Sequence, residues 1–133
     1  MMVDASAFLA ILLAEPEGPE IARRISGANA PYTSPLAIYE TATRLMSVRK
    51  ITAAESEAIV RAMLDEAGVR VIHITDAMTS IALHAFQQYG RGRHPADLNF
   101  GDCFAYACAK AYRAPLLYKG SDFAQTDLGA ALT

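Results

Sequence analysis

The sequence predicts one α/β domain over residues 1–133, with helices covering both faces of a mostly parallel sheet of four to five strands. Short β-branched or apolar runs alternate along the chain with longer segments of helical periodicity. Strands separated by helices form right-handed crossovers, which make neighbouring strands parallel. With 53% hydrophobic and 20% charged residues, a chain of 133 residues can build a core and is unlike a disordered protein.

The individual elements follow from local patterns. Ser34 followed by Pro35 is typical of a helix start, and Thr52 with Glu55 forms a capping box. The segment VRVIHI alternates at period two, as a strand does. Helices are expected over residues 5–14, 19–27, 35–50, 52–68, 75–90 and 100–112. Strands are expected over residues 3–4, 32–33, 69–74 and 114–118, with a last short strand after Asp127.

Composition excludes several classes of protein. The net charge of −2 provides no global positive field, so nucleic-acid binding would need a local patch or a metal ion. The first 18 residues lack the basic start of a signal peptide, and no run has the roughly 20 apolar residues of a membrane span. Cys103 and Cys108 fall on one predicted helix, where they cannot readily pair, and are expected to be reduced core residues. A cytoplasmic protein without a membrane partner is therefore expected.

Four acids are expected to meet at one edge of the sheet. Asp4 ends the first strand, Asp122 follows the last, and Asp102 begins the helix before that last strand. In open parallel sheets, ligands bind beyond the carboxyl ends of strands, where the strand order reverses. Glu40 lies beside the expected apolar side of its helix. That side is expected to comprise Leu36, Tyr39, Ala42 and Met46.

Each acid also has a purely structural interpretation. Asp102 at the third helical position after Asn99 complements the helix dipole, and Asp4 can cap the helix that follows it. Glu40 can be a solvated helix acid, and Asp122 can cap a short turn. Carboxylates crowded together repel one another, which a divalent cation relieves. Mg²⁺ and Mn²⁺ prefer oxygen ligands and suit phosphodiester hydrolysis, whereas cysteine and histidine spacing does not favour zinc.

Several motifs, in order along nearly the whole chain, resemble one family. They are MMVDASAFLAILLAEPEG, SPLAIYETATRL, GRGRHPADLNFGDCFAYACAK and PLLYKGSDF. They resemble PIN-domain ribonucleases, in particular the VapC toxins of bacterial type II toxin–antitoxin systems. The resemblance implies a PIN-like three-layer α/β/α sandwich and Mg²⁺-dependent cleavage of cellular RNA that inhibits translation and growth, with Mn²⁺ able to substitute. It also implies a homodimer and a cognate VapB-type antitoxin.

The resemblance also assigns roles to residues. It implies that Asp4, Glu40, Asp102 and Asp122 are catalytic, that Asp4 and Asp102 bind the metal, and that Asp127 is the alternative to Asp122. The hydroxyl residue that the family carries after its first acid corresponds to Ser6, expected to contact substrate. Ala5 stands at a position where the family often has threonine, which weakens the case for two hydroxyls at the site rim.

Arg91, Arg93 and His94 form a basic loop near Asp102 and are expected to contact RNA phosphates. The alternative for this loop is a solvated surface, because it has no interleaved aromatic residues. The alternative function is a non-catalytic PIN fold that binds RNA or protein. A phosphotransfer receiver domain and a D-x-D phosphatase both require a second acid that this chain lacks.

Overall fold

A computed structural model describes residues 1–129 of the chain. Four strands form one sheet in the order β3-β2-β1-β4, and all three neighbouring pairs are parallel. The strands are β1 (Met2–Val3), β2 (Tyr32–Thr33), β3 (Arg70–Val71) and β4 (Leu116–Leu117). The helices are α1 (Ala5–Leu12), α2 (Gly18–Ser26), α3 (Pro35–Arg49), α4 (Ala53–Ala67), α5 (Ala77–Tyr89) and α6 (Phe100–Ala111), with a 3₁₀ helix, η1, at Phe123–Gln125. The predicted α/β class and parallel sheet are confirmed.

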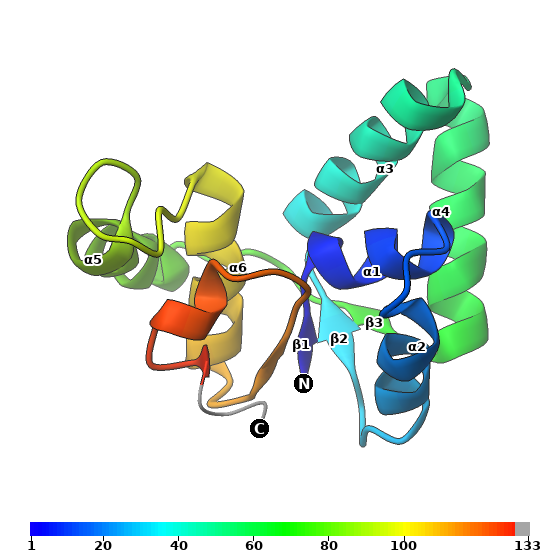
Figure 1. Cartoon of the computed structure of the whole chain (residues 1–133). Helices are drawn as coiled ribbons and strands as arrows, with labels where there is room; N and C mark the ends of the chain where they lie inside the picture. The colour runs from blue at the N-terminus through cyan, green and yellow to red at the C-terminus, as the bar shows by residue number, and fades with distance from the viewer. Residues whose placement is uncertain (130–133) are drawn as a thin grey trace.

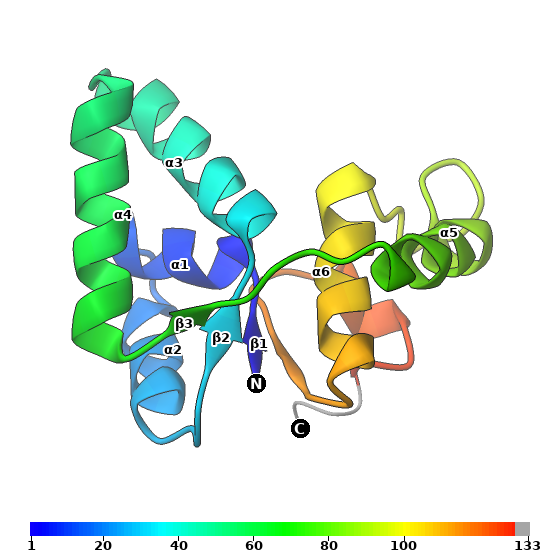
Figure 2. The same ribbon diagram turned by 180° about the vertical axis from the view of Figure 1, so that it is seen from behind.

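The helices form a layer on each side of the sheet (Figures 1 and 2). On one side, α1 packs against α2 and α3, and α3 packs against α4. On the other side, α5 packs against α6. The result is the three-layer α/β/α arrangement, with the sheet between the two groups of helices.

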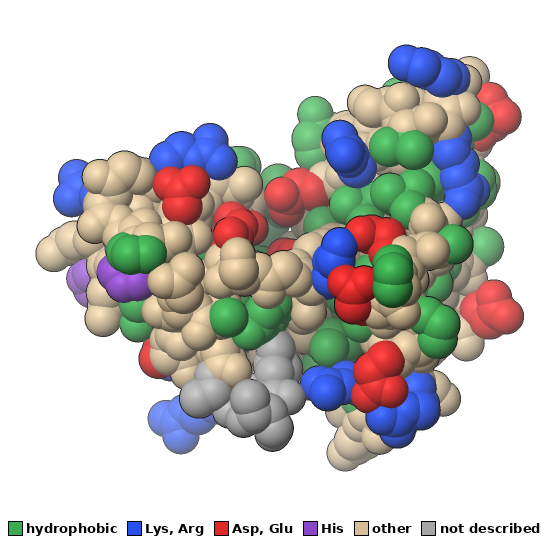
Figure 3. Space-filling view, in the orientation of Figure 1, with side chains coloured by type: hydrophobic (Ala, Val, Ile, Leu, Met, Phe, Trp, Pro, Cys, Tyr) green, Lys and Arg blue, Asp and Glu red, His purple; other side chains and the backbone are tan. Residues whose placement is uncertain are grey.

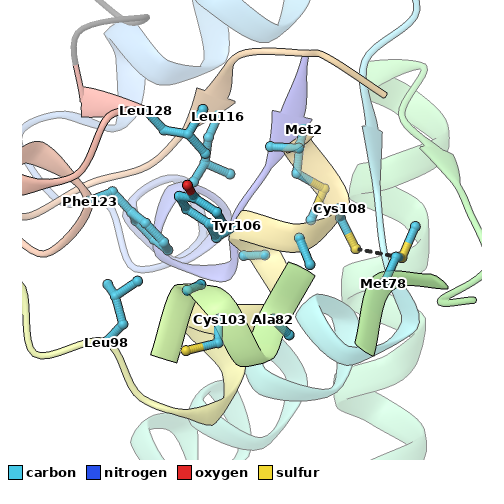
Figure 4. Packing of buried hydrophobic residues seen from close by; sticks show 14 of the residues in the cluster. Met2, Met78, Ala82, Leu98, Cys103, Tyr106, Cys108, Leu116, Phe123 and Leu128 are labelled. Atoms are coloured by element: carbon cyan, nitrogen blue, oxygen red, sulfur yellow. Dashed lines mark hydrogen bonds between the residues drawn. The ribbon is translucent and has the colours of Figure 1, made fainter. Parts of the chain in front are cut away.

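Two apolar cores lie on opposite faces of the sheet, because successive strand residues point in opposite directions. Met2 and Leu116 belong to the core under α5 and α6, whereas Val3 and Leu117 belong to the core under α1 to α4. Figure 4 shows the first core, where Cys108 lies beside Met78. Both cysteines are buried and unpaired, as predicted for core residues.

The predicted helix starts are formed by side-chain caps. The Ser34 hydroxyl accepts from the backbone N–H of Ala37 at 3.1 Å, and Thr52 makes its capping box with Glu55. Each cap satisfies a backbone donor that has no partner within the helix. The start of α5 differs from the prediction, because Asp76 rather than Thr75 precedes the first helical turn.

The predicted strand over residues 69–74 is much shorter in the structure. Arg70 and Val71 pair with β2, the backbone N–H of Ile72 still donates to the Thr33 carbonyl at 2.9 Å, and the chain leaves the sheet after that. The reason is the partner strand: β2 ends at Thr33, and Ser34 already begins α3. An edge strand cannot pair beyond the end of its only neighbour. The strand predicted after Asp127 is not found through Gly129, and its remainder lies outside the described residues.

The apolar side predicted for α3 is wrong. Tyr39 is 65% exposed, and Leu36, Ala42 and Met46 are only half-buried. The buried stripe is rotated around the helix and consists of Ala37, Ile38, Thr41 and Leu45. Thr41 fits there because its hydroxyl donates to the Ala37 carbonyl, so no polar atom of its side chain is left without a partner.

No helix within residues 1–129 is long and apolar enough to cross a membrane.

Candidate active site

Asp4 lies where the strand order of the sheet reverses. β1 has β2 on one side and β4 on the other, so its carboxyl end marks the switch point at which α/β sheets bind ligands. Asp4 follows β1 directly and caps α1, and it is only 5% exposed. Its Oδ2 accepts from the backbone N–H of Ser6 at 3.0 Å and from the Ser6 hydroxyl at 2.6 Å. The capping interpretation is therefore correct, and it places a carboxylate at the switch point.

Asp102 stands at the start of α6 in a reciprocal cap with Asn99. Asn99 Oδ1 accepts from the backbone N–H of Asp102 at 2.9 Å, and Asp102 Oδ2 accepts from the backbone N–H of Asn99 at 3.1 Å. The cap uses one carboxylate oxygen of Asp102. Among the described residues, no hydrogen bond reaches its Oδ1, which is left available for a ligand.

Glu40 reaches the same place from α3. Its carboxylate lies against the α-carbon of Gly101, since a Cβ built on that glycine would come within 2.1 Å of Glu40 Oε2. Gly101 precedes Asp102 directly, so the Glu40 carboxylate lies beside the first turn of α6. Figure 3 shows carboxylate side chains on both walls of the hollow between the α6 side and the α1–α3 side of the molecule.

Of the two candidates for the fourth acid, the structure couples Asp122 to the cluster. The charge of Asp122 raises the pKa values of Asp4 and Asp102. Asp122 precedes η1, but its side chain makes no capping hydrogen bond there. Asp127 instead accepts from the Tyr106 hydroxyl at 2.8 Å and pairs with Lys110.

Burial and mutual repulsion raise the pKa values of the clustered acids. Burial, followed by the charges of Asp4 and Asp102, raises the pKa of Glu40 to about 7. Burial also raises the pKa of Asp102 to about 6, against the opposing effects of the Asn99 N–H and of Arg91. The pKa of Asp4 is raised by burial although its hydrogen bonds from Ser6 lower it. Clustered acids with raised pKa values in a cleft are typical of functional sites.

The chemistry of this donor set fits a hard divalent cation. All of the donors are carboxylate oxygens, which Mg²⁺ and Mn²⁺ prefer. As the side chains lie, however, no three Asp, Glu, His or Cys residues within residues 1–129 are grouped closely enough to hold an ion. Asp4 and Asp102 each turn one oxygen to a backbone N–H, and crowded like charges repel one another.

The basic loop has one residue that acts on the acidic cluster. The charge of Arg91 lowers the pKa of Asp102, although Arg91 also lies 3.8 Å from Asp97. Arg93 turns away and stacks over the Phe86 ring, with its guanidinium carbon 5.1 Å from the ring centre. His94 accepts from the Ala96 N–H and packs edge-on against a tyrosine ring. Of these three residues, Arg91 is the one whose charge acts on Asp102, and contact of all three with RNA stays a prediction.

Two features of the site were not predicted from the sequence. One is Gly101, which lies inside the motif GRGRHPADLNFGDCFAYACAK but was given no role of its own. The other is the backbone N–H of Lys119, which donates to the Ser6 hydroxyl at 2.9 Å and links it to the end of β4. A backbone group carries no signature in the sequence, so this contact could not have been found from residue types.

Comparison with known proteins places the chain in a family. The family model of the PIN domain matches residues 1–128. The chain therefore belongs to the PIN-domain family. VapC ribonuclease R02377 of Rhizobium meliloti is 39% identical over 96% of this chain and 98% of the relative. Ribonuclease VapC36 of Mycobacterium tuberculosis is 37% identical over 96% of this chain and 91% of the relative. Within the family, the chain falls among the VapC ribonucleases.

Solved structures agree on the fold. Mycobacterium tuberculosis VapC20, described as a Sarcin-Ricin loop cleaving toxin, has a TM-score of 0.71 at 18% identity, covering 98% of this chain and 93% of that one. A toxin-antitoxin complex from Klebsiella pneumoniae contains a chain with a TM-score of 0.71 at 16% identity, covering 96% and 92%. At these identities the likeness extends to the fold alone.

Proposed function

We propose that this chain is a metal-dependent endoribonuclease that acts in the cytoplasm as the toxin of a VapBC pair. It hydrolyses phosphodiester bonds in cellular RNA and thereby inhibits translation and growth. The observation that supports this most is the gathering of Asp4, Glu40, Asp102 and Asp122 at the switch point of the sheet. None of the first three forms a salt bridge with Lys or Arg within residues 1–129.

Each acid has a distinct role in the proposal. Asp4 and Asp102 hold Mg²⁺, or Mn²⁺ in its place, through the oxygens that their caps leave available. The ion, when bound, supplies an activated water and neutralises charge on the phosphate. Glu40, with its pKa of about 7, can take up or release a proton at neutral pH. Asp122 adds negative charge that draws a cation into the site.

The non-catalytic alternative is not favoured. A module that merely binds RNA has no need of buried carboxylates that repel its ligand's phosphates. The relatives compared above are named as ribonucleases.

A direct experiment is to incubate the purified protein with total RNA, with Mg²⁺ or with a chelator, and to map the ends. The proposal expects new internal ends with Mg²⁺ and none with chelator. Intact RNA under both conditions would contradict it and restore the binding module.

The partner in the proposal is an antitoxin of the VapB type. A hollow of about 380 Å³ lies between α1, α2 and α4, and Ile11, Ile25 and Met63 are among its lining residues. Its largely aliphatic lining suits the apolar face of an amphipathic helix. Met63→Glu should therefore weaken antitoxin binding, measured by calorimetry, and leave RNA cleavage intact. Unchanged binding would place the antitoxin elsewhere.

The homodimer is proposed to use a different surface. Leu83 and Phe100 are 62% and 71% exposed, and they line an apolar hollow of about 420 Å³ with Phe86 and Phe104. Large contiguous apolar patches on a protein surface are typical of interaction sites. A second copy of the chain would bury this patch. Leu83→Glu should then shift the mass measured by light scattering from dimer to monomer, and an unchanged dimer would contradict this surface.

A further inference from the structure

Gly101 is a buried residue in the first turn of α6. The carboxylate of Glu40 occupies the space that a side chain at this position would fill. A Cβ at this position would lie 2.1 Å from Glu40 Oε2, 2.4 Å from Glu40 Cδ and 2.5 Å from Glu40 Oε1. Non-bonded heavy atoms pack at about 3.5–4.0 Å, so the whole carboxylate occupies the space that a side chain would take.

Backbone conformation does not explain the glycine. The glycines with positive φ among the described residues are Gly68, Gly92 and Gly120, so Gly101 has a backbone that other residues adopt. Glycine is also a poorer helix former than alanine, which makes it an unfavourable choice in α6 on local grounds. What requires a glycine here is the space occupied by Glu40.

We infer that Gly101 is a positioning residue for the metal site, because its bare α-carbon lets the Glu40 carboxylate lie beside Asp102. The inference rests on the proposed function, in which Asp4 and Asp102 bind a divalent cation and Glu40 lies beside them. Glu40 comes from α3 and Asp102 from α6, and these two helices pack together. The closeness of the two acids therefore depends on how near the Glu40 side chain can approach the first turn of α6.

Adding a methyl group at position 101 should move Glu40 and leave the fold in place. The clashing atoms belong to the far end of a flexible side chain, which can rotate away. The α6 backbone needs no change, and alanine favours the helix. Gly101→Ala should therefore melt no lower than the wild type while losing affinity for the ion. If Gly101 had a merely structural role, Gly101→Ala would instead lower the melting temperature of the protein.

The test is a double-mutant cycle on four proteins: wild type, Gly101→Ala, Glu40→Ala and the double variant. Mn²⁺ affinity is measured by calorimetry, and the urea midpoint is measured without metal. Gly27→Ala is the matched control, because a Cβ there meets its nearest atom at an ordinary 3.5 Å. We expect Gly101→Ala to weaken Mn²⁺ binding about tenfold or more, the usual effect of removing the support of a metal ligand.

In the Glu40→Ala background the same change should leave Mn²⁺ affinity unaltered, and it should raise the urea midpoint more than it does in the wild type. Both results follow from there being no carboxylate left to displace. Equal losses of affinity in both backgrounds, or unaltered affinity in Gly101→Ala, would overturn the inference while leaving the proposed function intact. A wild type that neither binds Mn²⁺ nor cleaves RNA would overturn both.

Discussion

Ser6 donates its hydroxyl proton to the buried carboxylate of Asp4, with 2.6 Å between Oγ and Oδ2. The same hydroxyl accepts from the backbone N–H of Lys119 at 2.9 Å. Because Lys119 fills the acceptor side of the hydroxyl, the proton of Ser6 is directed at Asp4. Ser6 thus fixes the position of Asp4 relative to the end of β4. The sequence predicted Ser6 as a substrate contact and did not predict this positioning role.

Ser6→Ala should therefore destabilise the protein and disturb the site together. Loss of a hydrogen bond to a buried charged group costs about 1.5–3 kcal/mol, which urea unfolding would measure. The pKa of Asp4 should rise further, since this bond lowers it. Ser6→Thr retains the hydroxyl and serves as the control. If Ser6→Ala were as stable and as active as the wild type, the link would have no function.

The sequence predicted those parts of the site that depend on local pattern. Asn99 and Asp102 were expected as N-cap and third helical residue, and the structure shows both hydrogen bonds of that cap. The pairing of β1 with β4, which the site required, is also observed. Helix caps can be predicted because they depend on residue types at short spacing. The pairing of strands can be predicted because it follows general rules of topology.

Features that depend on tertiary packing were not predictable. The buried side of α3 was misplaced because apolar residues occur all around this helix, so its pattern gave no single face. The turning of Arg93 onto Phe86 depends on where α5 places that ring. The closeness of Glu40 and Gly101 depends on how α3 crosses α6, which no spacing in the sequence encodes.

The stability of the metal-free protein should depend on pH through Glu40. Its pKa is raised from 4.5 to about 7, so the folded protein binds a proton more tightly than the unfolded chain does. The resulting contribution to stability is complete below pH 4.5 and is lost as the pH rises through 7. Relative to Glu40→Gln, the wild type should therefore lose stability between about pH 5 and pH 8. Parallel pH profiles of the urea midpoint would contradict the raised pKa.

Asp122 and Asp127 should respond in opposite ways to the same substitution. Asp122→Asn should slow RNA cleavage with little change in melting temperature, because its side chain makes no capping bond. Asp127→Asn should cost about 1 kcal/mol of stability through its contacts with Tyr106 and Lys110, while cleavage continues. The reverse pattern would make Asp127 the fourth acid.

Arg91 and Arg93 form a similar matched pair for RNA binding. Arg91→Ala should weaken RNA binding and reduce the slope of log affinity against log salt by about one, as for a single phosphate contact. Arg93→Ala should have a smaller effect, because its guanidinium stacks on Phe86. Affinities measured in chelator, where no cleavage is expected, would separate the two. Equal salt slopes for the two variants would mean that the loop acts only through its net charge.

The central claim is that Asp102 serves a metal-dependent active site in addition to capping α6. The most direct measurement is the rate of RNA cleavage in Mg²⁺ by wild type and Asp102→Asn, with folding followed by circular dichroism. An asparagine oxygen can still accept from the Asn99 N–H, and removal of the charge relieves repulsion, so the variant should remain folded. The account predicts a folded Asp102→Asn protein without cleavage activity. A folded variant that cleaves RNA at the wild-type rate would show that Asp102 is a helix cap and nothing more.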